Sequence, residues 1–319
     1  KDKKPSSFSL NGTWKFNLSK NYDSCFKFFY NTEFNDSNWN DIQVPGHIQF
    51  QGFDNPHYTD VTYPWDGHDV VKPGQIDMDK NKVYQYRKTF DCPQDFIGNK
   101  LILSFEGAES NIYVWLNGKF IGYAEDSFTP SRFDITKYTQ EKDNVLSVRI
   151  FQKCTGTWLE DQDMWRFTGL FRDVMIYKQP SQHIQDLKID TDIDLDTNKS
   201  VLSCVCKMSS NESHTLQAKL YDPQGNIVWN GNMQDTFEIP VENTCLWSSE
   251  FPNLYQLELV LYDTNNEIIE TIQEQVGFRK FTLEYGIMKL NGKRIVFHGI
   301  NRHEWDPKTG RCLSQEQME

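Results

Sequence analysis

The sequence predicts an all-β protein made of two antiparallel β-sandwiches and a short third region. Apolar and polar residues alternate in short runs, for example Val83–Phe90, Asn144–Ile150 and Tyr255–Tyr262, and this alternation is typical of half-buried strands. Turn signals such as Asn117-Gly118 separate the runs, and no stretch has the periodicity of a convincing amphipathic helix. Short strands at this spacing favour antiparallel sandwiches.

The length of the chain and a change of pattern near residue 180 indicate two sandwich domains. At 319 residues the chain exceeds the usual size of one domain. The first set of strands ends near Tyr177, and Lys178–Ser181 has the composition of a linker. Residues 183 to 278 then contain further alternating runs, among them Ile184–Ile189 and Val201–Cys206. About seven strands in this length fit an immunoglobulin-like sandwich.

A different pattern begins after Arg279. Met288–Leu290 leads into an Asn291-Gly292 turn, and Arg294–Ile300 is a short apolar run. Such a run is typical of a strand that is buried on both faces, as in a parallel sheet. A (β/α) barrel takes about 250 residues, so we expect this region to provide only the first strand of one.

Composition and charge argue against two classes of partner. The net charge is −12 and no stripe of Lys and Arg is present, so nucleic acid is not expected. No run approaches the roughly 18 apolar residues of a membrane span and no targeting segment is recognisable, so no membrane partner is expected. The seven cysteines lack a disulfide-framework spacing, which favours reduced thiols and a cytoplasmic location. We interpret Cys204 and Cys206 as two small residues on one buried strand face.

The first candidate site is an acidic cluster in Thr157–Arg166. Glu160, Asp161 and Asp163 place three carboxylates in four positions, with a tryptophan on either side. If the segment is extended, Asp161 and Asp163 share one face, and ionising both requires a cation, an arginine or donor hydroxyls nearby. Indoles beside convergent carboxylates are typical of sugar sites. The alternative is a solvated acidic loop with two core tryptophans.

Two loops complete the list of candidate regions. Tyr58–Lys82 is long, rich in aromatic residues and proline, and without periodicity. Long loops inside compact domains are usually functional, so this is the second place for a site. Glu125-Asp126-Ser127 is interpreted as a solvated turn.

Four separated motifs carry a resemblance to a known family. They are Tyr58–Trp65, Tyr113–Gly118, Leu159–Arg166 with the Gly169–Val174 stretch after it, and Gly299–Glu304. In this order they resemble the motifs of the bacterial β-galactosidases of glycoside hydrolase family 2. The resemblance extends from about Leu10 to Glu316.

The resemblance implies a fold and an activity. It implies a jelly-roll, galactose-binding-like domain over residues 1–180, an immunoglobulin-like domain over 181–285, and the start of a (β/α)8 barrel over 286–319. The implied reaction is retaining hydrolysis of terminal non-reducing β-D-galactose by two glutamates. In this family both glutamates lie on later barrel strands, so no catalytic residue is expected here. The chain should be inactive without the rest of the barrel, and the parent enzyme could be a homo-oligomer.

The resemblance also assigns binding residues. Asp163 matches the aspartate that meets galactose hydroxyls and a sodium ion, and His303 matches a histidine at the end of the first barrel strand that binds a galactose hydroxyl. Asp60 and Val61 match a loop that reaches into the same site. The family usually has asparagine in place of Asp60, and a carboxylate cannot donate a hydrogen bond as an amide can. The family's magnesium ligands are not expected in this chain.

Other interpretations remain open at this point. His303 could be a structural donor, and Asp60 could cap its turn. A second departure from the family lies in Glu304–Pro307, where many relatives have histidines after the Arg-His-Glu motif. The protein could be a stand-alone carbohydrate-binding module of two sandwiches, or a family member that acts on a β-glucuronide or β-mannoside. Residues 286 to 316 oppose the stand-alone module, and the acidic cluster opposes a glucuronide, whose own carboxylate would be repelled.

Overall fold

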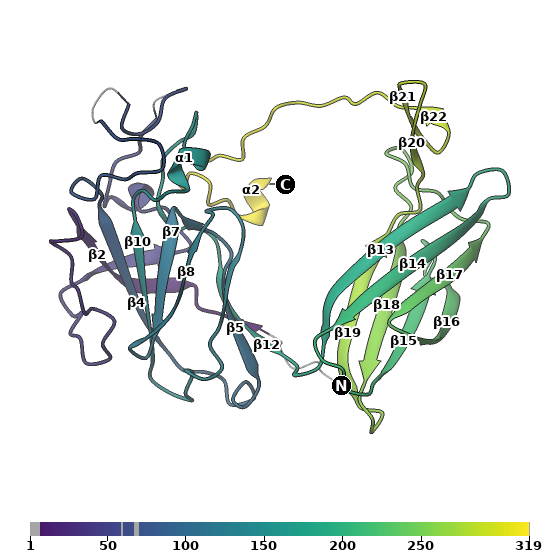
Figure 1. The fold of residues 1–319 in the computed structure, drawn as a ribbon, viewed down its shortest axis with the longest axis horizontal. Helices are drawn as coiled ribbons and strands as arrows, with labels where there is room; N and C mark the ends of the chain where they lie inside the picture. Colours follow the sequence, from purple (N-terminus) through teal and green to yellow (C-terminus); the bar gives the residue numbers. More distant parts are fainter. Residues whose placement is uncertain (1–6, 59, 67–69, 319) are drawn as a thin grey trace. The chain divides into compact units, whose positions relative to one another are not determined.

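The computed structural model describes residues 7–58, 60–66 and 70–318 and divides into two compact units. Unit 1 contains the residues up to Gln179 and those from Arg302 onward, and unit 2 contains Pro180–Asn301. Both consist of antiparallel strands (Figure 1). Within the described ranges helix is limited to η1 (Gln49–Gln51), α1 (Thr157–Glu160) and α2 (Gln315–Met318). The expected scarcity of helix is confirmed, and no described helix is long and apolar enough to span a membrane.

Unit 1 is a sandwich of a six-stranded and a four-stranded sheet, with orders β3-β2-β4-β10-β7-β8 and β1-β12-β5-β9, and a separate β6-β11 pair. One hydrophobic core joins residues of both sheets, such as Trp14 and Val148 from the first and Leu103 and Ile176 from the second. The strands are β1 (Ser7–Ser9), β2 (Gly12–Ser19), β3 (Asn40–Val44), β4 (Val83–Phe90), β5 (Lys100–Phe105), β6 (Ala108–Glu109), β7 (Asn111–Leu116), β8 (Lys119–Glu125), β9 (Ser131–Asp134), β10 (Asn144–Phe151), β11 (Gly169–Leu170) and β12 (Val174–Gln179).

The hairpin between β7 and β8 forms at the residues that predicted it. Asn117 and Gly118 both have positive φ angles, 50° and 78°. Two consecutive left-handed residues make the type I′ turn that matches the twist of the flanking strands, and Asn-Gly adopts it at low cost. The Asn117 side chain also binds across to β10, because its Oδ1 accepts from the Val145 N–H at 2.8 Å.

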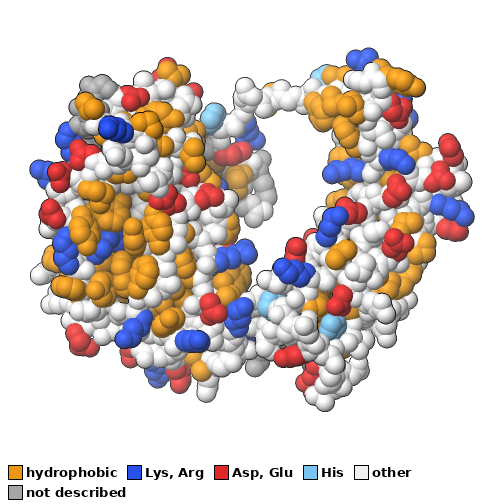
Figure 2. Space-filling view, viewed as in Figure 1, with side chains coloured by type: hydrophobic (Ala, Val, Ile, Leu, Met, Phe, Trp, Pro, Cys, Tyr) orange, Lys and Arg blue, Asp and Glu red, His pale blue; other side chains and the backbone are white. Residues whose placement is uncertain are grey.

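A loop over residues 20–39 covers the outer face of the six-stranded sheet. Gln85 and Arg87 on β4 point outward yet are buried, because they bind this loop: Gln85 Nε2 donates to the Phe26 carbonyl at 2.7 Å, and Arg87 Nε donates to Asp36 Oδ2 at 2.7 Å. Phe26 and Phe28 remain exposed, and Figure 2 shows hydrophobic side chains gathered over this sheet. The strand that the alternation predicted to be half-buried is therefore buried on both faces.

Unit 2 forms the predicted immunoglobulin-like sandwich, with sheet orders β13-β14-β17 and β16-β15-β18-β19. Cys204 and Cys206 are buried while Val205 is exposed, as the strand alternation predicts, and all seven cysteines are free thiols. At the start of β18 the Tyr255 hydroxyl accepts from the Cys245 N–H at 3.0 Å, a tie typical of this fold. The strands are β13 (Ile184–Asp194), β14 (Lys199–Met208), β15 (Thr215–Tyr221), β16 (Ile227–Met233), β17 (Thr236–Glu242), β18 (Tyr255–Tyr262) and β19 (Ile268–Val276).

The region after unit 2's sandwich differs from the prediction in one respect. Residues 281 to 294 form a small sheet of β20 (Phe281–Glu284), β21 (Ile287–Leu290) and β22 (Lys293–Arg294). The buried strand expected over Arg294–Ile300 does not form: residues 295–300 have no strand pairing, and Phe297 and Ile300 are 73% and 87% exposed. A parallel strand needs neighbouring strands to satisfy its backbone, and the described residues supply none beside it.

Candidate functional site

The acidic cluster in Thr157–Arg166 is not extended. Asp161 and Asp163 would share one face only in an extended segment. Thr157–Glu160 forms α1, stabilised at its start by the Cys154 N–H, which donates to Thr157 Oγ1 at 3.0 Å. After the helix the chain turns, so that Asp161 is buried whereas Asp163 is exposed and has a left-handed φ of 53°. The two aspartates therefore have different environments and different roles.

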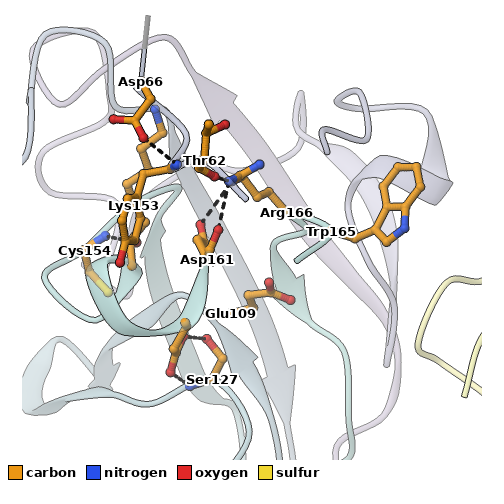
Figure 3. A network of polar contacts seen from close by, with 12 residues as sticks. Thr62, Asp66, Glu109, Ser127, Lys153, Cys154, Asp161, Trp165 and Arg166 are labelled. Carbon is orange, nitrogen blue, oxygen red and sulfur yellow. Dashed lines mark hydrogen bonds and ion pairs between the residues drawn. The ribbon is translucent and has the colours of Figure 1, made fainter. Parts of the chain in front are cut away.

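Asp161 belongs to a structural network with Arg166 (Figure 3). Arg166 Nη2 donates to the Asp161 backbone carbonyl at 2.8 Å and to the Thr62 carbonyl, while its Nε lies 3.9 Å from Asp161 Oδ2. Burial raises the pKa of Asp161 to about 6, against the opposing effect of Arg166. Asp161 and Arg166 thus join the acidic segment to the loop that follows Tyr58.

Glu160 anchors the segment on its other side. Its carboxylate accepts from the Ser127 N–H at 2.9 Å and the Ser127 hydroxyl at 2.6 Å, and Ser127 is fully buried. Glu125 accepts from the Gly156 N–H at 2.9 Å. The interpretation of Glu125-Asp126-Ser127 as a solvated turn is therefore wrong for Ser127 and Glu125, because both position α1.

Asp163 lies beside the second predicted region. The Tyr58 hydroxyl donates to Asp163 Oδ1 at 2.8 Å, and the Tyr58 ring stacks on Trp165 with centroids 5.2 Å apart. The hydrogen bond to Asp163 and the charges of Asp163 and Asp60 raise the pKa of Tyr58. Two carboxylates, a hydroxyl and an exposed indole thus meet at one place, which is the composition of a sugar site.

Hydrogen bonds to backbone carbonyls join the loop that contains Asp60 and Val61 to the segment that carries Asp163. Gln162 Nε2 donates to the Val61 carbonyl at 3.3 Å, and the Arg166 N–H donates to the His57 carbonyl at 2.8 Å. Asp60 and Val61 are both exposed. The structure therefore brings the two sequence-predicted regions together. It adds Tyr58, which the sequence marked only as one aromatic residue among several in the loop.

His303 lies in the same unit, although it belongs to the third region of the sequence. It is exposed, and Trp305, two residues further on, stacks on Trp165 with centroids 5.3 Å apart. Asp163 likewise lies two residues before Trp165. Two residues span at most about 7 Å of chain. The backbones of His303 and Asp163 therefore both lie near the stacked rings of Trp305 and Trp165. No motif or pattern in the sequence had indicated Trp305 for this role.

A sodium ion at Asp163 would require further oxygen ligands. Among the described residues no group of three or more His, Cys, Asp or Glu side chains could hold a metal ion. One oxygen of Asp163 already accepts from Tyr58. The exposed Asp163 carboxylate could supply one oxygen ligand to a cation. The acidic side chains of the described residues do not supply the other ligands that a metal site needs.

Glu109 at the end of β6 makes the stability of unit 1 depend on pH. Burial raises its pKa from 4.5 to about 8, although Arg311 opposes the shift. The folded chain therefore holds this proton to higher pH than the unfolded chain does. The stabilisation is complete below pH about 4.5 and is lost as the pH rises to about 8.

Glu109→Gln cannot ionise, so between pH 5 and 8 it should lose less unfolding free energy than the wild type. The expected difference is at least about 1.4 kcal/mol, the equivalent of one pKa unit. Urea unfolding at both pH values measures it, with exposed Glu274→Gln as the control. Parallel pH dependence of Glu109→Gln and the wild type would contradict the assignment.

Comparison with protein families assigns each part of the chain. Residues 8–180 match the model of the glycosyl hydrolases family 2 sugar binding domain. Residues 182–279 match the glycosyl hydrolases family 2 model, and residues 281–319 match the family's TIM barrel domain. The region with the unformed strand is thus similar in sequence to the start of a barrel.

Curated relatives are similar over nearly the whole chain. A β-galactosidase of Halalkalibacterium halodurans is 45% identical, over 97% of this chain and 31% of that protein. A β-galactosidase of Clostridium acetobutylicum is 40% identical, over 99% of this chain and 36% of that protein. The chain therefore spans about a third of the length of these relatives.

Solved structures share the fold. A β-glucuronidase of Ruminococcus gnavus has a TM-score of 0.75 at 19% identity, over 97% of this chain and 50% of that one. A β-glucuronidase of Bacteroides uniformis has a TM-score of 0.76 at 23% identity, over 97% of this chain and 37% of that one. At this identity the likeness concerns architecture alone. The family matches over 8–180, 182–279 and 281–319 show that the chain belongs to glycoside hydrolase family 2.

Proposed function

We propose that this chain is the N-terminal, non-catalytic part of a β-galactosidase that removes terminal non-reducing β-D-galactose. The observation that carries the proposal is the meeting of Asp163, Tyr58 and Asp60 beside the exposed Trp165. Carboxylates accept from sugar hydroxyls, and an indole packs on the apolar face of a sugar ring. The similarity to curated β-galactosidases supports galactose as that sugar.

Each residue has a defined part in this proposal. Asp163 accepts from galactose hydroxyls and provides one ligand to a sodium ion, while Asp60 and Val61 form the loop wall of the site. His303 binds a further hydroxyl in the transition state. The acid/base and nucleophile are two glutamates outside this chain, which would stand only about 5 Å apart in a retaining enzyme.

The isolated chain should show no hydrolysis of a chromogenic β-galactoside. Binding groups alone supply neither a proton to the leaving group nor a nucleophile, so there is nothing to carry the reaction. The measurement is a turnover assay of the purified 319-residue chain. Turnover that disappears in Asp163→Ala would show that the acidic cluster itself is catalytic and would contradict the proposal.

A longer protein that continues past Glu319 tests the substrate. With β-galactoside, β-glucuronide and β-mannoside offered in parallel, the galactoside should give the highest kcat/KM. A glucuronide brings its own carboxylate toward Asp163 and Asp60, which would repel it. Preference for the glucuronide or the mannoside would refute the substrate assignment while leaving the family intact.

Further properties of the whole enzyme follow as proposals. The free thiols support a cytoplasmic location, since reduced cysteines persist there. Sodium acts at Asp163 and magnesium at ligands outside this chain. The assembly includes the rest of the barrel and could be a homo-oligomer. A similar protein of Leuconostoc lactis, 39% identical, is called a β-galactosidase large subunit, so assembly with a second subunit is the alternative.

A further inference from the structure

Arg311 joins three parts of unit 1 that are distant in the sequence. Its Nη1 donates to Glu109 Oε2 at 2.8 Å, and its Nη2 donates to the Trp165 backbone carbonyl. The guanidinium also lies over the rings of Phe128 and Phe167, 5.2 and 5.0 Å from their centroids. The Arg311 and Glu109 side chains are only 15% and 5% exposed. A planar donor fork held between two rings is an arrangement that lysine cannot reproduce.

The turn that carries Arg311 packs closely on the sandwich. Asp306 and Gly310 exchange backbone hydrogen bonds of 2.9 and 2.8 Å, and the Cys312 thiol donates to the Phe171 carbonyl at 3.2 Å. Gly310 has a φ of 65°, and a Cβ there would lie 2.7 Å from the Phe50 ring. Any larger residue would push the turn away from the sandwich, so close packing is built into the turn.

We propose that Arg311 is a positioning residue that holds the segment 302–312 on the sugar-binding domain and thereby places His303 beside Asp163. Glu109 and the Trp165 carbonyl are its two anchor points, and the second lies two residues from Asp163. The attachment of the segment stands on these contacts alone. The consequence for His303 rests on the proposed function.

The first test measures attachment through the Cys312 thiol in the 319-residue chain. Burial raises the pKa of this thiol to about 11, so in the closed segment it should react slowly with a disulfide reagent. Arg311→Ala should raise the rate of Cys312 modification about tenfold or more, because opening the segment exposes the thiol. Arg311→Lys should lie between the wild type and Arg311→Ala.

Two controls separate local opening from unfolding. Buried Cys92 of the same unit must stay slow in every variant, since only global unfolding would expose it. Arg302→Ala removes an arginine of the same segment whose ion pair, 2.9 Å, is with Glu304 two residues away, and it should leave Cys312 slow. An unchanged Cys312 rate in both Arg311 variants would overturn the proposal. Fast Cys312 in Arg311→Lys with slow Cys92 supports it even if Arg311→Ala fails to fold.

The second test uses the longer enzyme and asks whether Arg311 acts through His303. Arg311→Ala should lower kcat/KM for a β-galactoside about tenfold. In a His303→Ala background the same substitution should lower it less than about twofold, because the effects of substituting coupled residues do not add. Equal losses in both backgrounds would overturn the positioning role. If no version hydrolyses a β-galactoside, the proposed function fails, and the Cys312 rates still decide whether Arg311 holds the segment.

Discussion

Arg87→Ala should lower the unfolding free energy of the chain by about 3–5 kcal/mol, because Arg87 is buried and its removal leaves its ion-pair partner and several backbone acceptors without their donor. Arg87 is 4% exposed, pairs with Asp36 at 2.7 Å, and donates to the backbone carbonyls of Phe29, Asn31 and Phe34. Without it, these acceptors in the 20–39 loop lose their donor. The loop should then detach from the outer face of the six-stranded sheet.

Denaturant unfolding of the 319-residue chain measures this loss, and Lys15→Ala is the matched control. Lys15 pairs with Asp41 at 2.8 Å on the neighbouring strands of the same sheet, but the two side chains are 36% and 61% exposed. An exposed pair contributes about 0–1 kcal/mol. Similar small losses in the two variants would show that Arg87 does not hold the loop.

Asp163→Ala in a longer enzyme should lower kcat/KM for a β-galactoside about tenfold or more. The variant removes a charge-assisted contact to a sugar hydroxyl worth about 1.5–3 kcal/mol. It also removes one acceptor of the Tyr58 hydroxyl and, in the proposed function, one ligand of the sodium ion. Steady-state kinetics measure the loss, and thermal unfolding of the same variant shows whether the fold is retained.

The strands could be predicted because their determinants are local. β4 and β18 begin and end at the residues where the alternation begins and ends. The Asn117-Gly118 turn is likewise set by the φ preferences of two residues. Immediate neighbours in the sequence therefore determined this part of the fold.

Features that depend on distant partners could not be predicted. The helix α1 is four residues long, too short to produce a 3.6-residue period. Burial of Ser127 follows from Glu160, and burial of Arg87 follows from the 20–39 loop. The apolar run over residues 295–300 predicted a strand that does not form here. Such a run forms a strand only when neighbouring strands pair with it, and the described residues supply none.

The same distinction applies to the candidate site. The resemblance assigned Asp163, Asp60, Val61 and His303 by motif, and no local pattern would have grouped them. Tyr58 and Trp305 were not assigned, because their roles appear only when residues more than a hundred positions apart meet at Trp165.

The most direct test of the central claim compares Asp163→Asn with Asp126→Asn in the longer enzyme across a sodium titration. Both aspartates are exposed and have positive φ, but Asp126 accepts only from Phe128 and Thr129 of its own turn among the contacts of the described residues. If Asp163 binds galactose and sodium, Asp163→Asn lowers the rate and weakens its sodium dependence, because the amide keeps the size but loses the charge. Asp126→Asn should leave both nearly unchanged. Equal, small effects at the two positions would contradict a sugar site at Asp163.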